Sequence, residues 1–400
     1  QLKNNQYWDL KQNKLNTIKK LTDINNSGDP YIIYKSNKGF DLYTNFSKKI
    51  ILNKKNIHRF LNKKKISHKS KNTDLFIGFF GYELLNNLIG VKIPKQKNIN
   101  FPQGIFYKPE KKLSFTNNLF YKNDNNDRLK SKFKINMDRK SYSKIFDKFK
   151  KKIRSGETYQ IKICTKYKTV SKINPLDFFC RLSKINLAPE AFMIKDKNYS
   201  IISCSPENLI NKKGTLISTK PIAGTVKKTK DMNKAKALNY FRKNIKETKE
   251  HNMIVDMERN DLSRICKVGS VKLSRTKIIE EYKDLFHYVS LIKGKIKKNV
   301  RNIDIIKAMM PGGSVIGCPK ISTLNLLNKQ EKENRNIYTG SFGYIKFNGD
   351  MKFNIIIRSI LNFKGFSEIS VASGVVVDSN ANHEFNENYI KAKALIDLFK

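Results

Sequence analysis

Residues 340–377 read GSFGYIKFNGDMKFNIIIRSILNFKGFSEISVASGVVV and carry the clearest structural signal in the chain. Three apolar runs, at 340–347, 352–363 and 368–377, are separated by short turn sequences such as Asn348-Gly349-Asp350, which is typical of consecutive strands. Further strand-like runs occupy 159–167, 199–204 and 215–218. Because helices are interspersed among these strands without strict alternation, the pattern favours an α+β fold with antiparallel sheets.

Two long helices are expected among these strands. Apolar residues from Tyr142 to Ile153 recur at helical spacing, and Gly156 follows them as a stop signal. A second helix is predicted over 231–257. Nearer the start of the chain, the run LFIGFFGY at 75–82 predicts a buried strand whose glycines permit a close backbone approach.

A turn-rich segment divides the chain. Residues 122–138 include the sequence NDNND and are the best candidate for a linker. We therefore predict an N-terminal region over 1–136 and a larger domain over 137–400. A chain of 400 residues can form one large domain or two to three ordinary ones, and it is long enough to bury a sizeable hydrophobic core.

The composition is strongly basic, with 80 Lys and Arg against 34 Asp and Glu and a formal net charge of +46. Such a charge suggests nucleic-acid binding. However, only 12 of the 80 basic residues are arginine, whose bidentate fork is prominent in phosphate and base recognition. The lysines are also spread through the whole chain. We therefore interpret the charge as a general surface property and expect no nucleic-acid partner, with a basic nucleic-acid-binding protein as the non-enzymatic alternative.

The sequence also predicts a cytoplasmic location. It contains no run of about 18 to 20 apolar residues that could span a bilayer. The first residues lack the apolar core of a signal peptide. Five cysteines without a C-x-x-C pair indicate reduced, buried thiols, not disulfides or a zinc site.

Two pairs of glutamates, Glu247 with Glu250 and Glu384 with Glu387, are each three residues apart, so each pair lies on one face of a predicted helix. Four carboxylates from two helices could converge on a hard divalent cation, which prefers oxygen ligands. Alternatively, they are solvated partners of nearby lysines, as Glu387 would be with Lys391 one turn later. Spacing alone leaves both interpretations open.

The loop GGSVIGCPK at 312–320 is rich in glycine but does not match the phosphate-binding loop pattern, because Pro319 precedes Lys320 where that pattern has glycine. It could present backbone N–H groups to an anion, or be a plain turn.

From about Ser141 to Lys400 the chain resembles the chorismate-utilising enzymes, a family that includes the large subunits of aminodeoxychorismate synthase and anthranilate synthase. The matching motifs occur in the family's order: GETYQ at 156–160, SPE at 205–207, PIAGT at 221–225, ETKEH at 247–251 with VDMERNDL at 255–262, and MPGGS at 310–314 continuing to Lys320. Any one of these motifs is a weak signal, whereas their common order over two thirds of the chain is specific.

The resemblance implies a fold of two large antiparallel β-sheets packed face to face, with helices on the outside and an N-terminal region like the family's N-terminal subdomain. It also implies that Glu250 and Glu387 hold Mg²⁺, with Glu247 and Glu384 supporting the ion through water. In that role the ion orients the ring carboxylate of chorismate.

The resemblance further implies a substrate site. Arg358 and Lys391 match basic residues that bind the substrate carboxylates, and Tyr338 and Gly374 match residues that line the same pocket. Glu207 matches the general acid that protonates the departing C4 hydroxyl, a role that needs a carboxyl kept protonated by burial. The other residues that the motifs imply are His287, Gln160, Ala223, Thr225 and Ser314 as catalytic residues and Lys320 as a substrate-binding residue.

The identity of the nucleophile follows from position 160. Relatives that use water carry a lysine base there, so Gln160 implies ammonia as the nucleophile. No glutaminase Cys–His–Glu pattern occurs in the sequence, so ammonia is expected from glutamine through a separate amidotransferase subunit.

Two signals disagree about the carbon that is aminated. Gly312-Gly313-Ser314 and the run FNIIIR at 353–358 resemble aminodeoxychorismate synthases, which aminate C4 and serve p-aminobenzoate and folate synthesis. Ala223 resembles anthranilate synthases, because many aminodeoxychorismate synthases have a lysine there that attacks the ring. The resemblance therefore implies amination at C4, with anthranilate synthase component I as the enzymatic alternative. Ser373, where the family has a smaller residue, is expected to crowd the carboxylate pocket.

Overall fold

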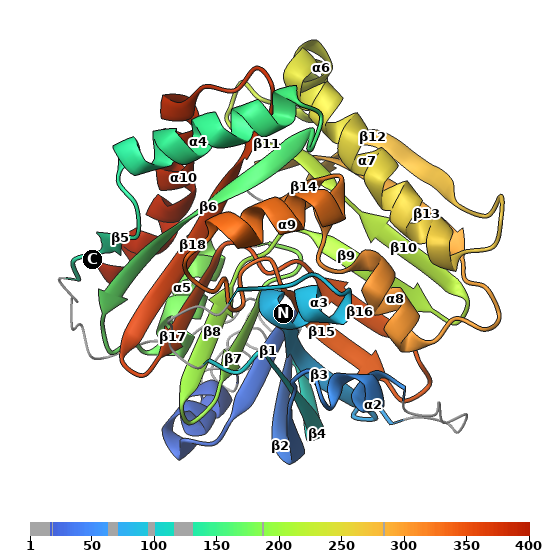
Figure 1. Cartoon of the computed structure of the whole chain (residues 1–400). Helices are drawn as coiled ribbons and strands as arrows, with labels where there is room; N and C mark the ends of the chain where they lie inside the picture. The colour runs from blue at the N-terminus through green and yellow to red at the C-terminus, as the bar shows by residue number, and fades with distance from the viewer. Residues whose placement is uncertain are drawn as a thin grey trace.

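The computed structural model describes residue 17 and residues 19–62, 71–94, 101–115, 131–185, 188–282 and 285–400. Its 18 described strands form one continuous hydrogen-bonded sheet, in which every pairing is antiparallel (Figure 1). Helices lie against the outside of this sheet (Figure 1). The predicted α+β class with antiparallel pairing is therefore confirmed.

The sheet has two halves that are connected by a hairpin. One half consists, from its edge inward, of β6 (Gln160–Val170), β18 (Phe366–Val375), β17 (Ser359–Phe363), β8 (Tyr199–Ser203), β7 (Phe192–Lys195) and β1 (Tyr31–Ser36). The other half consists of β2 (Gly39–Ile51), β4 (Gly104–Phe115), β3 (Leu75–Phe80), β15 (Ser341–Lys346), β16 (Met351–Asn354), β9 (Asn208–Lys213), β10 (Leu216–Lys220), β13 (Leu285–Lys295) and β12 (Lys272–Glu281). β5 (Lys134–Ile135) and β14 (Gly317–Cys318) pair with β6, and β11 (Ile222–Lys227) pairs with β13. The β1–β2 hairpin connects the halves.

The two halves face each other across a shared apolar core. This core includes Ile32 of β1 and Phe192 of β7 from one half, and Ile77 of β3 and Phe342 of β15 from the other. The rings of Phe192 and Phe342 stack with their centroids 3.7 Å apart and their planes 2° from parallel. The face-to-face arrangement is therefore confirmed, and the hairpin joins the two expected sheets into one.

The N-terminal region contributes strands to this sheet. β3 lies between β4 and β15, and it confirms the buried strand predicted at 75–82. A Cβ atom on Gly78 would lie 1.9 Å from the backbone oxygen of Ile105, so the close approach of β3 to β4 requires glycine. Much of the predicted linker, 122–138, lies outside the described residues, and the division at residue 136 stays a prediction.

The helices pack on the outer faces of the sheet. Their bounds are α2 (Ile57–Leu61), α3 (Tyr82–Leu88), α4 (Arg139–Arg154), α5 (Pro175–Ile185), α6 (Lys234–Lys243), α7 (Ile245–Ile265), α8 (Asn302–Met309), α9 (Lys320–Gln330) and α10 (Ala381–Ile396), with short 3-10 turns η1 (Gly313–Val315) and η2 (Asp397–Phe399). α4 and α9 share an apolar cluster with β6, whereas α7 and α8 share one with β10 and β13 (Figure 1).

The helix predicted from the apolar stripe before Gly156 is confirmed as α4. The stripe is buried as expected, at Tyr142, Phe146, Phe149 and Ile153. Asp138 caps the helix by accepting a hydrogen bond from the backbone N–H of Ser141, and Gly156 follows the C-terminus with φ +76°.

The single helix predicted over 231–257 is wrong, because two helices, α6 and α7, meet at Asn244. The backbone of Asn244 is extended, with φ −83° and ψ 93°, and its side chain accepts a hydrogen bond from the backbone N–H of Glu247. Asparagine forms such local bonds readily, so it favours the start of a helix over its interior. The break fixes where α7 begins, and therefore where Glu247 and Glu250 point.

The strand predicted over 352–363 is also wrong as a single element. It is interrupted between β16 and β17, where Arg358 adopts a left-handed backbone with φ +51°. At this interruption the N–H of Ile355 bonds to the carbonyl of Glu207, and the N–H of Cys204 bonds to the carbonyl of Arg358. The N–H of Ile355 and the carbonyl of Arg358 are therefore satisfied by more distant segments, and Arg358 and Glu207 line the same cavity.

The structure also bears on two predictions, those about the cysteines and about membrane-spanning segments. The five cysteines form no disulfide in the described residues, and four of them are buried. Within the same residues, no helix combines the length and apolar character needed to cross a lipid bilayer.

We expect the stacked pair between the halves to contribute strongly to stability. Phe342→Ala removes a fully buried ring and should lower the free energy of unfolding by about 3–5 kcal/mol. Phe366→Ala is the matched control, because that ring is 45% exposed and its loss should change the free energy by about 0.5 kcal/mol or less. Denaturant titration of both variants tests this, and equal shifts of the two midpoints would contradict the shared core.

Candidate active site

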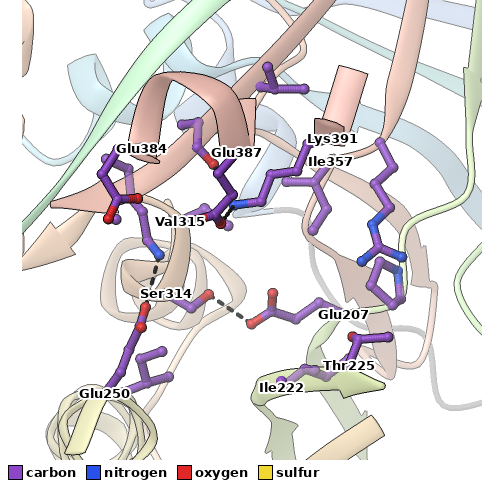
Figure 2. A pocket seen from close by; sticks show the side chains of 18 of the residues that line it. Glu207, Ile222, Thr225, Glu250, Ser314, Val315, Ile357, Glu384, Glu387 and Lys391 are labelled. Atoms are coloured by element: carbon purple, nitrogen blue, oxygen red, sulfur yellow. Dashed lines mark hydrogen bonds and ion pairs between the residues drawn. The ribbon is translucent and has the colours of Figure 1, made fainter. Parts of the chain in front are cut away.

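A cavity of about 640 Å³ lies where strands of the two sheet ends meet α7 and α10 (Figure 2). β6 and β18 line it from one end of the sheet and β11 from the other. The charged residues that line it are Glu207, Glu247, Glu250, Glu384 and Glu387 with Lys162, Arg358 and Lys391. The acidic and basic groups are therefore concentrated in one partly enclosed space.

The two glutamate pairs approach the cavity from different helices. Glu247 and Glu250 lie in the first turns of α7, and Glu384 and Glu387 lie in α10 (Figure 2). Helical spacing of three residues keeps each pair on one face. All four carboxylates therefore line one cavity, which fits one of the two interpretations that their spacing left open.

Cationic side chains contact the carboxylates of this cavity. Glu250 Oε1 accepts hydrogen bonds from Gln160 Nε2 at 2.6 Å and from Lys162 Nζ at 3.1 Å. Glu387 Oε1 lies 2.6 Å from Lys391 Nζ. Burial alone would lower the pKa of Lys162, but the charges of Glu250 and Glu387 outweigh it and raise that pKa.

Sequence reasoning did not identify Lys162. A strand places alternate side chains on one face, so Lys162 shares the face of Gln160 in β6. The alternation of side chains along a strand was therefore the sequence signal that could have identified Lys162.

The glutamates could hold a hard divalent cation. Donor atoms of His383, Glu384 and Glu387 all lie within 4.8 Å of one another. The carboxylates of Glu247 and Glu250 line the same cavity, so the donors are mainly oxygen, which suits Mg²⁺. Glu387 also forms the ion pair with Lys391 that the alternative interpretation of the spacing expects, and Glu250 pairs with Lys162.

Glu207 is a buried acid at the wall of the cavity. It is 5% exposed and lies in the Ser205-Pro206-Glu207 segment between β8 and β9. Ser314 Oγ donates a hydrogen bond to Glu207 Oε1 at 2.7 Å (Figure 2). Burial raises the pKa of Glu207 to about 7, against the lowering effects of Ser314, Lys162 and Arg358. The group can therefore carry a proton at neutral pH, as a general acid must.

His287 lies behind Thr225. The two residues face each other in the β11–β13 pairing, and His287 Nδ1 lies 2.9 Å from Thr225 Oγ1. Burial, together with the charge of Arg358, lowers the pKa of His287 to about 4, so its imidazole is neutral at pH 7. Thr225 lines the cavity directly, whereas His287 contacts it through Thr225. Ala223 lies in the same strand, but its side chain is outside the described set.

Arg358, Tyr338 and Gly374 line the cavity as the resemblance implies. A Cβ atom on Gly374 would lie 2.7 Å from Gln160 Nε2 and 2.8 Å from Lys162 Nζ. Glycine at this position therefore leaves room for the two side chains that hold Glu250.

The expected crowding by Ser373 is wrong. Ser373 is fully buried, and its hydroxyl donates to the backbone oxygen of Glu384 at 3.0 Å, while its neighbours Ala372 and Gly374 line the cavity. Successive residues of β18 point to opposite faces, so this hydroxyl anchors α10 and leaves the pocket free.

Lys320 is the predicted site residue that the structure places elsewhere. It does not line the cavity, and it begins α9 with its Nζ 2.6 Å from Asp261 Oδ2 and 3.3 Å from the carbonyl of Ala308. Gln160 and His287 do not line the cavity themselves, but each contacts a residue that does, Glu250 and Thr225 respectively. The other predicted site residues whose side chains are described line the cavity. Lys320 therefore has a structural partner, Asp261, in the described residues.

We expect Lys320 to contribute to stability. Its side chain is 10% exposed and that of Asp261 is 5% exposed, so Lys320→Met leaves a buried, uncompensated carboxylate and should cost about 3–5 kcal/mol of unfolding free energy. The double variant Lys320→Met/Asp261→Leu should recover part of this loss. Lys393→Met is the control, because its pair with Asp397 is exposed and should cost about 1 kcal/mol or less. Equal losses in the two single variants would contradict the role of Lys320.

Comparison with known proteins agrees with these features. The model of a protein family described as chorismate binding enzyme matches residues 21–397. Aminodeoxychorismate synthase component 1 of Bacillus subtilis is 36% identical over 255 residues, which cover 64% of this chain and 54% of that protein. An anthranilate synthase component I-like protein of Synechocystis is 35% identical over 262 residues, which cover 65% of this chain and 54% of that protein. The match spans about half the length of these curated relatives.

A solved structure extends the comparison to the whole fold. The crystal structure of anthranilate synthase component I from Streptococcus pneumoniae superimposes with a TM-score of 0.74 at 26% identity. The superposition covers 91% of this chain and 89% of that chain. The structural match therefore extends beyond the segment that carries the motifs.

Proposed function

The chain belongs to the family of chorismate binding enzymes, and we propose that it aminates chorismate at C4 to give 4-amino-4-deoxychorismate. The contact between Ser314 and Glu207, 2.7 Å long, carries this proposal. Ser314 ends the Gly312-Gly313-Ser314 sequence that resembles the C4-aminating branch, and it touches the acid that would protonate the C4 hydroxyl. Anthranilate formation also removes the C4 hydroxyl, so this contact supports the protonation step in both reactions, and the Gly312-Gly313-Ser314 sequence favours C4.

Ammonia is the nucleophile that the site favours. Gln160 cannot accept a proton from water as a lysine base would, and its amide nitrogen is engaged with Glu250. The relatives named above are first components of their synthases, which supports a separate amidotransferase chain as the source of ammonia.

The substrate is a dianion, and the cavity offers cations to hold it. Arg358 and Lys391 would bind its carboxylates, and Tyr338 would pack against the bound molecule. Glu250 and Glu387 would hold Mg²⁺, with Glu247 and Glu384 in support. When bound, this ion would neutralise and orient one carboxylate of the substrate.

Glu207 would then donate its proton to the C4 hydroxyl oxygen, so that water leaves when the C–O bond breaks. Neutral His287, held by Thr225, would keep the wall beside the ring uncharged.

Anthranilate synthase component I is the second candidate. Ala223 favours it, because the covalent lysine of many C4-aminating relatives is absent at this position. Ammonia would then have to attack the ring directly in either reaction.

A product assay separates the two reactions. The chain is incubated with chorismate, ammonium and Mg²⁺, with and without an aminodeoxychorismate lyase. We expect p-aminobenzoate only when the lyase is present, because C4 amination leaves the enolpyruvyl group for the lyase to remove. Fluorescent anthranilate formed without the lyase would refute C4 amination and support the second candidate.

The same assay examines the metal site. Turnover should require Mg²⁺, and Glu387→Gln should reduce it strongly because it removes a ligand charge at nearly constant volume. Glu333→Gln is a suitable control, since Glu333 pairs with Lys168 away from the cavity. Near-normal rates for Glu387→Gln would refute its assignment as a ligand.

The pH dependence should follow Glu207. A general acid must be protonated, and burial raises the pKa of Glu207 to about 7, so kcat/KM should decline as pH rises through about 7. The hydrogen bond from Ser314 stabilises the carboxylate and lowers this pKa. Ser314→Ala should therefore move the decline to higher pH. A midpoint that stays in place or moves to lower pH would contradict the assignment.

A further inference from the structure

A lysine of β6 lies among the acidic groups of the cavity and has no role in the reaction proposed above. Lys162 lines the cavity, and its side chain is 14% exposed. Its Nζ lies 3.1 Å from Glu250 Oε1. A positive charge that belongs to the chain itself therefore contacts one of the two carboxylates that would hold the metal ion.

The surroundings of Lys162 hold its ammonium group against Glu250. Lys162 is the register partner of Gly374 in the β6–β18 pairing. A Cβ atom on Gly374 would lie 2.8 Å from Lys162 Nζ and 3.4 Å from Glu250 Oε1. Glycine at this position therefore leaves the space in which the ammonium and the carboxylate meet.

The oxygen that Lys162 contacts is one that a divalent cation would need. Glu250 Oε1 accepts hydrogen bonds from both Gln160 and Lys162. Hard cations bind such carboxylate oxygens, and two positive charges next to one oxygen repel each other. An ion at Glu250 therefore competes with the ammonium of Lys162 for the same atom.

We propose that Lys162 is the resident cation of Glu250 in the metal-free protein and competes there with the divalent cation. The proposal rests on the role of Glu250 as a metal ligand in the proposed function. Lys162 keeps this carboxylate neutralised when no ion is bound, and it leaves Glu250 when an ion binds. The affinity of the site for Mg²⁺ is therefore set in part by Lys162.

The exchange needs a place for the displaced ammonium. Lysine carries its charge on a flexible four-carbon stem, and Lys162 borders a cavity of about 640 Å³. Glu207 and Glu387 line the same cavity, so the ammonium remains near other carboxylates after it leaves Glu250. Movement of one side chain can therefore clear Glu250 for the ion.

Calorimetric titration with MgCl₂, in the absence of chorismate and ammonium, tests the competition. Lys162→Met removes the charge and keeps an unbranched stem, so we expect the dissociation constant for Mg²⁺ to fall about tenfold. Lys162→Gln also removes the charge but keeps an N–H donor, and it should bind Mg²⁺ more tightly as well. A dissociation constant within about twofold of the wild-type value in both variants would overturn the proposal.

Lys168→Met is the matched control for the change in net charge. Lys168 belongs to the same strand, but it pairs with Glu333 and does not line the cavity. Its loss should change the dissociation constant for Mg²⁺ by less than about twofold. Equal tightening in Lys168→Met and Lys162→Met would assign the effect to overall charge and would also overturn the proposal.

Thermal unfolding provides a second measurement that needs no turnover. Without Mg²⁺, Lys162→Met leaves Glu250 without its cation, so the variant should unfold at a lower temperature than the wild-type protein. Added Mg²⁺ should raise the unfolding temperature more in the variant, because stabilisation by a ligand increases as its dissociation constant falls. Equal increases in the two proteins would contradict the competition.

These measurements separate failure of the inference from failure of the proposed function. Equal Mg²⁺ binding by the wild-type protein and both Lys162 variants would overturn the inference and leave the metal site in place. Absence of Mg²⁺ binding in all of them would refute the metal site and the inference together. Tighter binding by the variants of a protein that does not aminate chorismate would support the inference and refute the proposed reaction.

Discussion

Charge compensation inside the cavity is the constraint on which the rest of the site depends. Five glutamates line a partly buried space, where like charges repel unless cations or protons balance them. Lys162 and Lys391 balance Glu250 and Glu387 through ion pairs, whereas Glu207 is balanced by a raised pKa. The Glu250–Lys162 pair joins α7 to β6, whereas Glu387 and Lys391 both belong to α10. The five glutamates share one cavity only when α7, α10 and β6 have been brought together.

The facing halves of the sheet provide that assembly. β6 and β13 are at opposite ends of the strand order, yet side chains from β6 and from β11, the partner of β13, line one cavity. This is possible because the sheet folds back at the β1–β2 hairpin and the shared core closes the two halves. The N-terminal strands therefore support the site although the motifs lie after them.

The net charge of +46 does not define the cavity. The groups that define the cavity are mostly acidic. Among its cations, Lys162 and Lys391 contact carboxylates, and Arg358 lies half-buried at the wall. The remaining lysines can provide a general positive field, which would favour capture of an anionic substrate. The charge thus supports the proposed site without defining it.

Local features could be predicted along the chain: the stripe of α4, the strand with Gly78, the glutamate pairs on single helix faces, and the motif order that indicated Glu207. These depend on spacing over a few residues, so they can be read along the chain. The partners of these residues depend on contacts between distant parts of the chain. Ser314 reaches Glu207 across 107 residues, and Lys320 reaches Asp261 across 59. Burial and ion pairing depend on such distant neighbours, which is why sequence reasoning misplaced Lys320. Lys162 shares a strand face with Gln160, so its position could have been predicted from local spacing.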